Sequence, residues 1–232
     1  MTAMRSLIAL AAVLATCTAC AEPRPFTPGG ALADTPADTP PRTAAGTAAP
    51  SGSPSGSVGS SASGGGRVDT VTVGPGLTVT IEWPARESAG RTAMLKALTD
   101  YIVGVRRAVA GDTTTDYRTL VQDDASRHAL AWVDTFRRDG HSLQGHIRIY
   151  RPAVKAVVGA GAEVSACVDE SGAELIDART RKALPDQPAW TRSPDGIYAQ
   201  MAGVRRGDDG VWRVISLQHA QQPQDPAKEC LQ

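Results

Sequence analysis

The spacing of apolar residues changes at Gly140 from three or four positions to two, and this change limits the folds that the chain can adopt. From about Thr92 to Ala110, apolar side chains form one stripe at helical spacing, which predicts a helix that Gly111 ends. A second amphipathic stretch begins at Asp123-Asp124 and closes at Gly140. Between the two, Thr114-Thr115-Asp116 predicts the cap of a short helix.

After Gly140, apolar and polar side chains alternate, which is the pattern of half-buried strands. Pro152 is expected to interrupt the first strand, and Glu170-Ser171-Gly172 is expected to form a turn. Helices followed by a meander of strands predict an α+β fold, in which N-terminal helices cover one face of a curved antiparallel sheet. The alternating segments are 68–83, 143–150, 154–158, 164–168, 175–176, 197–206 and 211–219.

Residues 1–20 have the pattern of a lipoprotein signal peptide. An apolar run from Leu7 to Ala15 is too short to span a membrane, and no later segment approaches 18 apolar residues. The small residue Ala19 stands before Cys20, which resembles a lipobox, in which the cysteine is lipidated and becomes the mature N-terminus. The number of cysteines favours Cys20 over Cys17 as the lipidated residue. Cleavage before Cys20 leaves Cys20 for the lipid and an even pair, Cys167 and Cys230, whereas cleavage before Cys17 would leave Cys20 as an odd thiol. Ordinary secretion and an uncleaved anchor are the alternatives.

Residues 21–66 differ in composition from the rest of the chain, with eight Pro, nine Gly and mostly Ser, Thr and Ala between them. Such a segment cannot bury enough apolar area to offset its ordering entropy, so we predict a disordered stalk. Residues 67–232 then form a single domain of the usual size. Lys+Arg and Asp+Glu balance at 24 each, and no basic run exceeds two residues, so nucleic acid is not an expected partner.

Two cysteines remain in the predicted domain, Cys167 and Cys230. A disulfide between them is the expected state if the chain is exported, because disulfides form and persist outside the cytoplasm. Cys230 lies in a polar C-terminal tail that has little apolar surface of its own, and covalent attachment to the strand of Cys167 explains its presence. The alternative is a pair of free thiols.

The residues that would carry chemistry also have ordinary structural explanations. Asp169, followed by Glu170, would act as a general base if burial raised its pKa, and the same pair suits a turn. Large aromatic residues, Trp190 among them, would line a ligand cavity or simply fill the core. The four histidines lack a zinc-binding spacing, and neither a metal nor a cofactor is expected. The candidate pocket residues are Tyr101, Tyr117, Trp132, Asp169, Tyr198 and Trp212.

Three segments of the predicted domain resemble a known family: GHIRIYRPAVKAVV (Gly145–Val158), VSACVDESGAELID (Val164–Asp177) and VWRVISL (Val211–Leu217). They are similar to segments of actinobacterial lipoproteins with a nuclear transport factor 2-like domain, a cone-shaped α+β fold. The resemblance implies a fold that hosts isomerases, cyclases, dehydratases and non-catalytic binders, so it implies no single activity.

From these patterns we predict a lipoprotein anchored to the outer face of the cell membrane, or a secreted protein. Its domain would be a non-catalytic module that binds a partner protein of the envelope or a small apolar ligand. The alternatives are an isomerase- or cyclase-like enzyme of the same fold and a structural envelope protein. An enzyme is expected to have a deep pocket with at least one buried carboxylate or histidine beside a second polar group. A binder is expected to have an apolar pocket or an exposed patch without that pair, and a structural protein neither.

Overall fold

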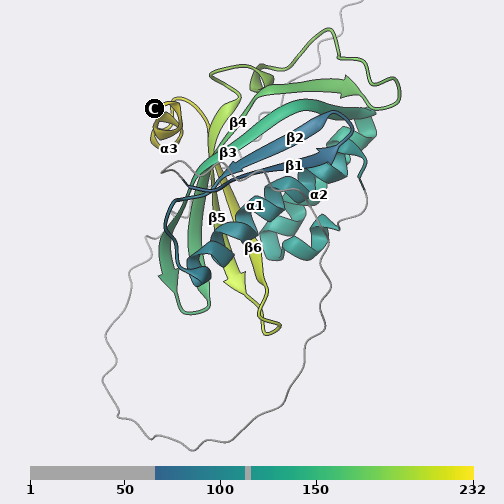
Figure 1. Ribbon diagram of the computed structural model, residues 1–232. Helices are drawn as coiled ribbons and strands as arrows, with labels where there is room; N and C mark the ends of the chain where they lie inside the picture. Colours follow the sequence, from purple (N-terminus) through teal and green to yellow (C-terminus); the bar gives the residue numbers. More distant parts are fainter. Residues whose placement is uncertain (1–65, 113–115) are drawn as a thin grey trace, which may run out of the picture. The chain divides into compact units, whose positions relative to one another are not determined.

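The computed structural model describes residues 66–112 and 116–232 (Figure 1). The predicted signal peptide with Cys17 and Cys20, and all of the predicted stalk except Gly66, lie outside the described residues. The elements of the described part are β1 (Val68–Gly74), β2 (Leu77–Glu82), α1 (Ala89–Ala110), a 3-10 helix (Tyr117–Leu120), α2 (Asp123–Asp139), β3 (His141–Val158), β4 (Gly161–Asp177), a 3-10 helix (Ala189–Thr191), β5 (Ile197–Arg206), β6 (Trp212–Ala220), α3 (Asp225–Lys228) and a final 3-10 turn (Glu229–Leu231).

The six strands form one mixed sheet in the order β1-β2-β3-β4-β5-β6. Four neighbouring pairs are antiparallel, but β2 and β3 run parallel, with Leu77 opposite Gly145 and Ile81 opposite Ile149. The predicted antiparallel sheet, and with it the expected nuclear transport factor 2-like arrangement of N-terminal helices on such a sheet, is therefore wrong. The hairpin β1–β2 precedes the helices, and α1 and α2 form a crossover that returns the chain so that β3 runs parallel to β2.

Both long helices begin and end close to the predicted positions. The side chain of Ser88 caps α1 by accepting a hydrogen bond from the Arg91 backbone N–H, and Gly111 ends the helix with a φ of 86°. Gly140 ends α2 in the same left-handed conformation, with a φ of 66°. Asp116 caps the 3-10 helix between them, while Thr114 and Thr115 lie outside the described residues.

The core lies between the sheet and the two long helices, which pack on the same face (Figure 1). In the described residues, no helix is both long enough and apolar enough to cross a membrane. Fully buried aliphatic residues from both layers fill the interface, and among them are Leu77, Val79, Leu95, Leu98, Ile102, Val133, Ile147, Ile149, Val164 and Val214.

β3 and β4 are long strands that pass through both predicted interruptions. Pro152 lies inside β3, where the pairing with β4 shifts between Tyr150 and Ala153 and Arg151 takes a positive φ of 51°. The segment Glu170–Gly172 is part of β4 rather than a turn. In this sheet, Pro152 and Glu170–Gly172 lie where the register between β3 and β4 shifts, not where a strand ends. A β-bulge can hold an extra residue without ending the strand.

The opposite face of the sheet carries the predicted disulfide, which joins Cys167 of β4 to Cys230 with a Cα–Cα distance of 5.5 Å. Cys167, Tyr150, Ala199 and Ala220 form a small buried cluster under the C-terminal tail, separate from the main core. Tyr150 donates its hydroxyl hydrogen to the Cys230 carbonyl, and Arg151 donates to the carbonyls of the tail. The tail is therefore docked by one covalent bond and several polar contacts.

Replacing both cysteines, Cys167→Ala with Cys230→Ala, is expected to lower the free energy of unfolding by about 2–4 kcal/mol, because the bond closes a long loop in the unfolded chain. Urea denaturation measures the loss. Reduction with dithiothreitol should lower the stability of the wild type by a similar amount and leave the double variant unchanged. Equal stability of the oxidised wild type and the double variant would contradict this assignment.

Candidate functional site

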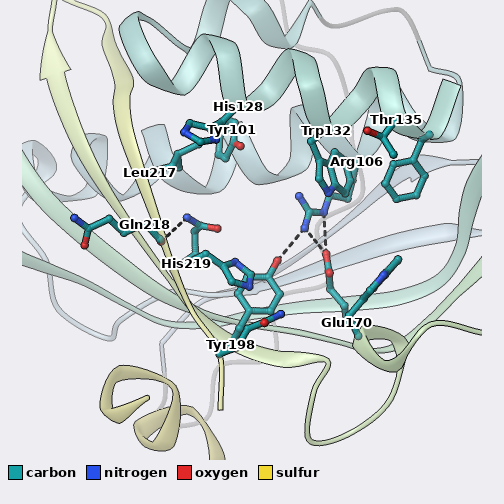
Figure 2. Close-up of a pocket in the computed structure, with 14 residues that line it drawn as sticks. Tyr101, Arg106, His128, Trp132, Thr135, Glu170, Tyr198, Leu217, Gln218 and His219 are labelled. Atoms are coloured by element: carbon teal, nitrogen blue, oxygen red, sulfur yellow. Dashed lines mark hydrogen bonds and ion pairs between the residues drawn. The ribbon is translucent and has the colours of Figure 1, made fainter. Parts of the chain in front are cut away.

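A cavity of about 630 Å³ lies between the helices α1 and α2 and the strands β4 to β6 (Figure 2). Its apolar and aromatic wall consists of Tyr101, Trp132, Phe136, Trp190, Tyr198 and Leu217. Its polar residues are His128, Thr135, Gln200, Gln218, His219 and Gln221, together with the charged residues Arg106 and Glu170. The volume suits a small molecule, and the lining combines six apolar or aromatic residues with eight polar or charged ones.

Regular helix and strand geometry positions most of these side chains. On α2, His128, Trp132 and Phe136 are spaced by four residues, so they lie on one side of the helix and border the cavity. On β5, Tyr198 and Gln200 are two residues apart and point to the same face, while Ala199 between them belongs to the cluster around the disulfide.

Glu170 reaches the cavity because β4 contains a β-bulge. Arg148 pairs with Asp169 and His146 pairs with Gly172, so Glu170 and Ser171 together stand opposite the single residue Ile147. The Asp169 carboxylate holds the bulge by accepting hydrogen bonds from the backbone N–H of Ser171 at 2.9 Å and from its hydroxyl at 2.6 Å.

The close approach of β3 and β4 beside this bulge requires glycine. Gly145 of β3 has a φ of +103°, and a Cβ atom there would lie 2.3 Å from the carbonyl oxygen of Gly172. On the other side of β4, the Glu170 backbone N–H donates to the Gly196 carbonyl at 2.8 Å. The backbone on both sides therefore fixes the position from which the Glu170 side chain enters the cavity.

Arg106 and Glu170 form a buried ion pair on the floor of the cavity (Figure 2). The two residues are 6% and 5% exposed. Arg106 Nε donates to Glu170 Oε1 at 3.0 Å, and Arg106 Nη2 donates both to the same oxygen and, at 2.9 Å, to the hydroxyl of Tyr198. The guanidinium also lies over the Trp132 ring, 4.5 Å from its centroid.

The pair and its surroundings fix the protonation of the neighbouring groups. Burial is the largest single effect on Arg106 and lowers its pKa, but the charge and hydrogen bond of Glu170, together with Tyr198 and Tyr101, outweigh it and raise the pKa, so Arg106 stays charged. Burial, together with the charge of Glu170, raises the pKa of Tyr198, which keeps its hydroxyl proton. Burial also lowers the pKa of His219, whose ring stacks on Tyr198 with centroids 4.1 Å apart, and this favours a neutral imidazole.

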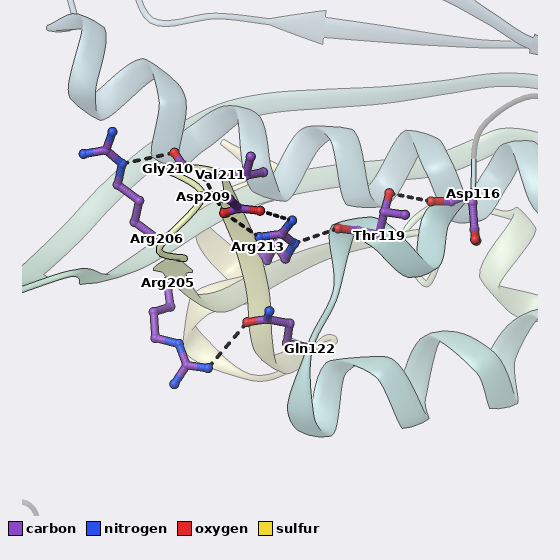
Figure 3. A network of polar contacts seen from close by, with 9 residues as sticks. All are labelled: Asp116, Thr119, Gln122, Arg205, Arg206, Asp209, Gly210, Val211 and Arg213. Carbon is purple, nitrogen blue, oxygen red and sulfur yellow. Dashed lines mark hydrogen bonds and ion pairs between the residues drawn. The ribbon is translucent and has the colours of Figure 1, made fainter.

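Contacts at the start of β6 hold this strand against the 3-10 helix Tyr117–Leu120 (Figure 3). Arg213 Nη2 donates to Asp209 Oδ2 at 2.6 Å, and its Nε donates to the Thr119 carbonyl at 3.0 Å. The hydrogen bond from Arg213 lowers the pKa of Asp209 to about 2. These contacts fix one end of the strand whose other end supplies Leu217, Gln218 and His219 to the cavity.

Three of the six candidate pocket residues, Tyr101, Trp132 and Tyr198, line the cavity, and Trp190 lines it as well. The other three lie elsewhere. Tyr117 is buried beside α1 against the core, Asp169 holds the bulge, and Trp212 packs against the core from the far end of β6.

The positions of Arg106, His219 and Glu170 in the cavity were not among the sequence-based predictions. One signal for Arg106 was present, because it follows Ile102 by four residues and therefore lies on the apolar stripe of α1. A charged residue on such a stripe requires a buried partner. Glu170 gave no comparable signal, since Glu170-Ser171-Gly172 is equally typical of a turn.

Among the described residues, no cluster of three or more His, Cys, Asp or Glu side chains is arranged to hold a metal ion. No family model matches the sequence, and no curated protein matches it. Among solved structures, the chain is similar to the intermembrane space region of the chloroplast protein ARC6, at 14% identity and a TM-score of 0.40. That match covers 59% of this chain and 99% of the other. A likeness this distant transfers no function.

Replacing Glu170 with Gln is expected to lower the free energy of unfolding by about 3–5 kcal/mol, because it leaves the buried Arg106 charge without a counter-ion. Glu82→Gln is the matched control, since Glu82 pairs with Arg148 where both side chains are 38% and 44% exposed, and it should cost about 0–1 kcal/mol. The double variant Arg106→Met with Glu170→Leu should regain most of the loss. Urea denaturation of the four proteins measures these differences, and equal losses for Glu170→Gln and Glu82→Gln would contradict the assignment.

Proposed function

We propose that this domain binds a small, largely apolar molecule in the cavity between the helices and the sheet, without chemical conversion of that molecule. The observation that carries the proposal is a cavity of about 630 Å³ in which six aromatic and aliphatic residues form one part of the wall, and on whose floor Arg106 and Glu170 neutralise each other. A pocket whose two charged residues neutralise each other favours a neutral ligand over an ion, because a net charge on the ligand would lie there without a partner.

A second candidate function, an isomerase- or cyclase-like enzyme, is favoured by one specific observation. The cavity holds a buried carboxylate, Glu170, beside the polar groups of Tyr198 and His219. We prefer binding, because the general base expected of such an enzyme is an unpaired acid, whereas the charge of Glu170 is balanced by Arg106.

We further propose that the chain is a lipoprotein anchored to the outer face of the cell membrane through Cys20. Its support comes from the apolar run before Cys20, from the cysteine parity and from the Cys167–Cys230 disulfide, since such bonds persist in oxidising compartments. A ligand-binding domain held at the membrane would meet apolar molecules that partition there. Secretion without an anchor is the alternative.

Binding in the cavity can be measured with the neutral, apolar fluorophore N-phenyl-1-naphthylamine and the purified full chain. We expect saturable binding with one site, which Thr135→Trp weakens about tenfold or more by filling the cavity mouth. Ala131→Trp is the matched control, because Ala131 lies one turn away on α2, is exposed and does not line the cavity. No saturable binding, or equal losses in the two variants, would refute a ligand site here.

The lipid anchor can be tested by expression in a bacterial host that processes lipoproteins. Mass spectrometry of the membrane fraction should find a mature N-terminus at Cys20 that carries a diacylglyceryl group. Cys20→Ser should abolish incorporation of labelled palmitate, whereas Cys17→Ser should retain it. A mature protein in the culture medium that begins at Glu22 would favour ordinary secretion instead.

A further inference from the structure

One carboxylate oxygen on the cavity floor has no hydrogen-bond donor in the described part of the chain. Arg106 donates through Nε and Nη2, and both bonds end on Glu170 Oε1. The Glu170 side chain is only 7% exposed and lines the cavity. Oε2 is not among the fully buried polar atoms that lack a partner, so it is accessible from the cavity and can accept a hydrogen bond from a donor there.

Next to it, the Tyr198 hydroxyl has the opposite requirement. Its oxygen accepts a hydrogen bond from Arg106 Nη2, but its own proton has no acceptor among residues 66–112 and 116–232. The residue is 5% exposed and lines the same cavity. The Tyr198 hydroxyl and Glu170 Oε1 both bind Arg106 Nη2, so the Tyr198 and Glu170 side chains meet at the same guanidinium group (Figure 2).

We propose that the cavity recognises a neutral hydroxyl group on an apolar body, so that the ligand is an apolar alcohol or phenol. The hydroxyl donates to Glu170 Oε2 and accepts from Tyr198, which satisfies both groups with one ligand atom. The apolar body lies against Phe136, Trp190 and Leu217. This inference rests on the proposed ligand-binding function and specifies the chemical class of its ligand.

Charged ligands suit the site less well, because the ion pair already balances its own charges. A ligand carboxylate would face the carboxylate of Glu170, and an ammonium group would face the guanidinium of Arg106. A hydrocarbon would leave both Glu170 Oε2 and the Tyr198 proton unsatisfied, and a ketone would satisfy only Tyr198. A hydroxyl group fits because it is both a donor and an acceptor.

The test is a series of four fluorescent probes that share one apolar body: pyrene, 1-pyrenemethanol, 1-pyrenecarboxylate and 1-pyrenemethylammonium. Their dissociation constants for the purified full chain are measured at neutral pH by fluorescence anisotropy. We expect 1-pyrenemethanol to bind about tenfold more tightly than pyrene, which corresponds to about 1.4 kcal/mol. Burial of apolar surface alone would favour pyrene, the more apolar molecule, so this order reports the hydrogen bonds.

Two tyrosine variants locate the hydrogen bonds. Tyr198→Phe should reduce the preference for the alcohol over pyrene about threefold to tenfold. Tyr117→Phe removes the same atom from a buried tyrosine that does not line the cavity, and it should leave the preference unchanged. Thermal unfolding followed by circular dichroism checks that both variants are folded, and the wild-type series decides the question if Tyr198→Phe is not.

The other possible results distinguish failure of the hydroxyl inference from failure of the proposed ligand-binding function. If pyrene binds as tightly as the alcohol, the hydroxyl inference fails while the ligand-binding function stands. If the carboxylate or the ammonium probe binds most tightly, Arg106 or Glu170 alone selects the ligand and the inference fails. If none of the four probes binds, the inference fails together with the proposed function.

Discussion

The buried ion pair between Arg106 and Glu170 joins the helix layer to the sheet, and the shape of the cavity depends on it. Two such charges lose their hydration when they are buried, and only close geometry and further hydrogen bonds offset the loss. The structure supplies both. Trp132 covers the guanidinium, Tyr198 accepts a third hydrogen bond from it, and the bulge in β4 sets the direction of the Glu170 side chain. Replacing the pair with apolar residues would preserve stability but remove the polar groups of the cavity floor.

The parallel pairing of β2 and β3 explains why the cavity lies where it does. The crossover between these strands, in which α1 and α2 lie one after the other, keeps both helices on one face of the sheet. α1 then contributes Arg106 to the floor, and α2 contributes Trp132 and Phe136 to the wall. The opposite face is left to the C-terminal tail, which the disulfide attaches.

The helices and the disulfide could be predicted from the sequence, because they depend on local spacing, on capping residues such as Gly111 and Gly140, and on cysteine parity. The sheet order could not, because alternation indicates that a segment is a strand but not which strand lies beside it. For the same reason, only part of the cavity lining could be predicted from the sequence. Trp132 and Tyr198 stood out by size, whereas Glu170 depends on a bulge whose residues, Glu170-Ser171-Gly172, are equally typical of a turn.

The two faces of the sheet are coupled through β4 and β5, because neighbouring residues of these strands point to opposite sides. Val168 pairs with Tyr198, whose ring lines the cavity, while the adjacent pair, Cys167 and Ala199, belongs to the cluster around the disulfide. The covalent bond behind the strands therefore restrains the backbone that carries Tyr198. A hydrogen-bonding site benefits from such restraint, because groups that are already held in place lose less conformational entropy when a ligand binds. The disulfide thus contributes to the geometry of the cavity as well as to the stability of the fold.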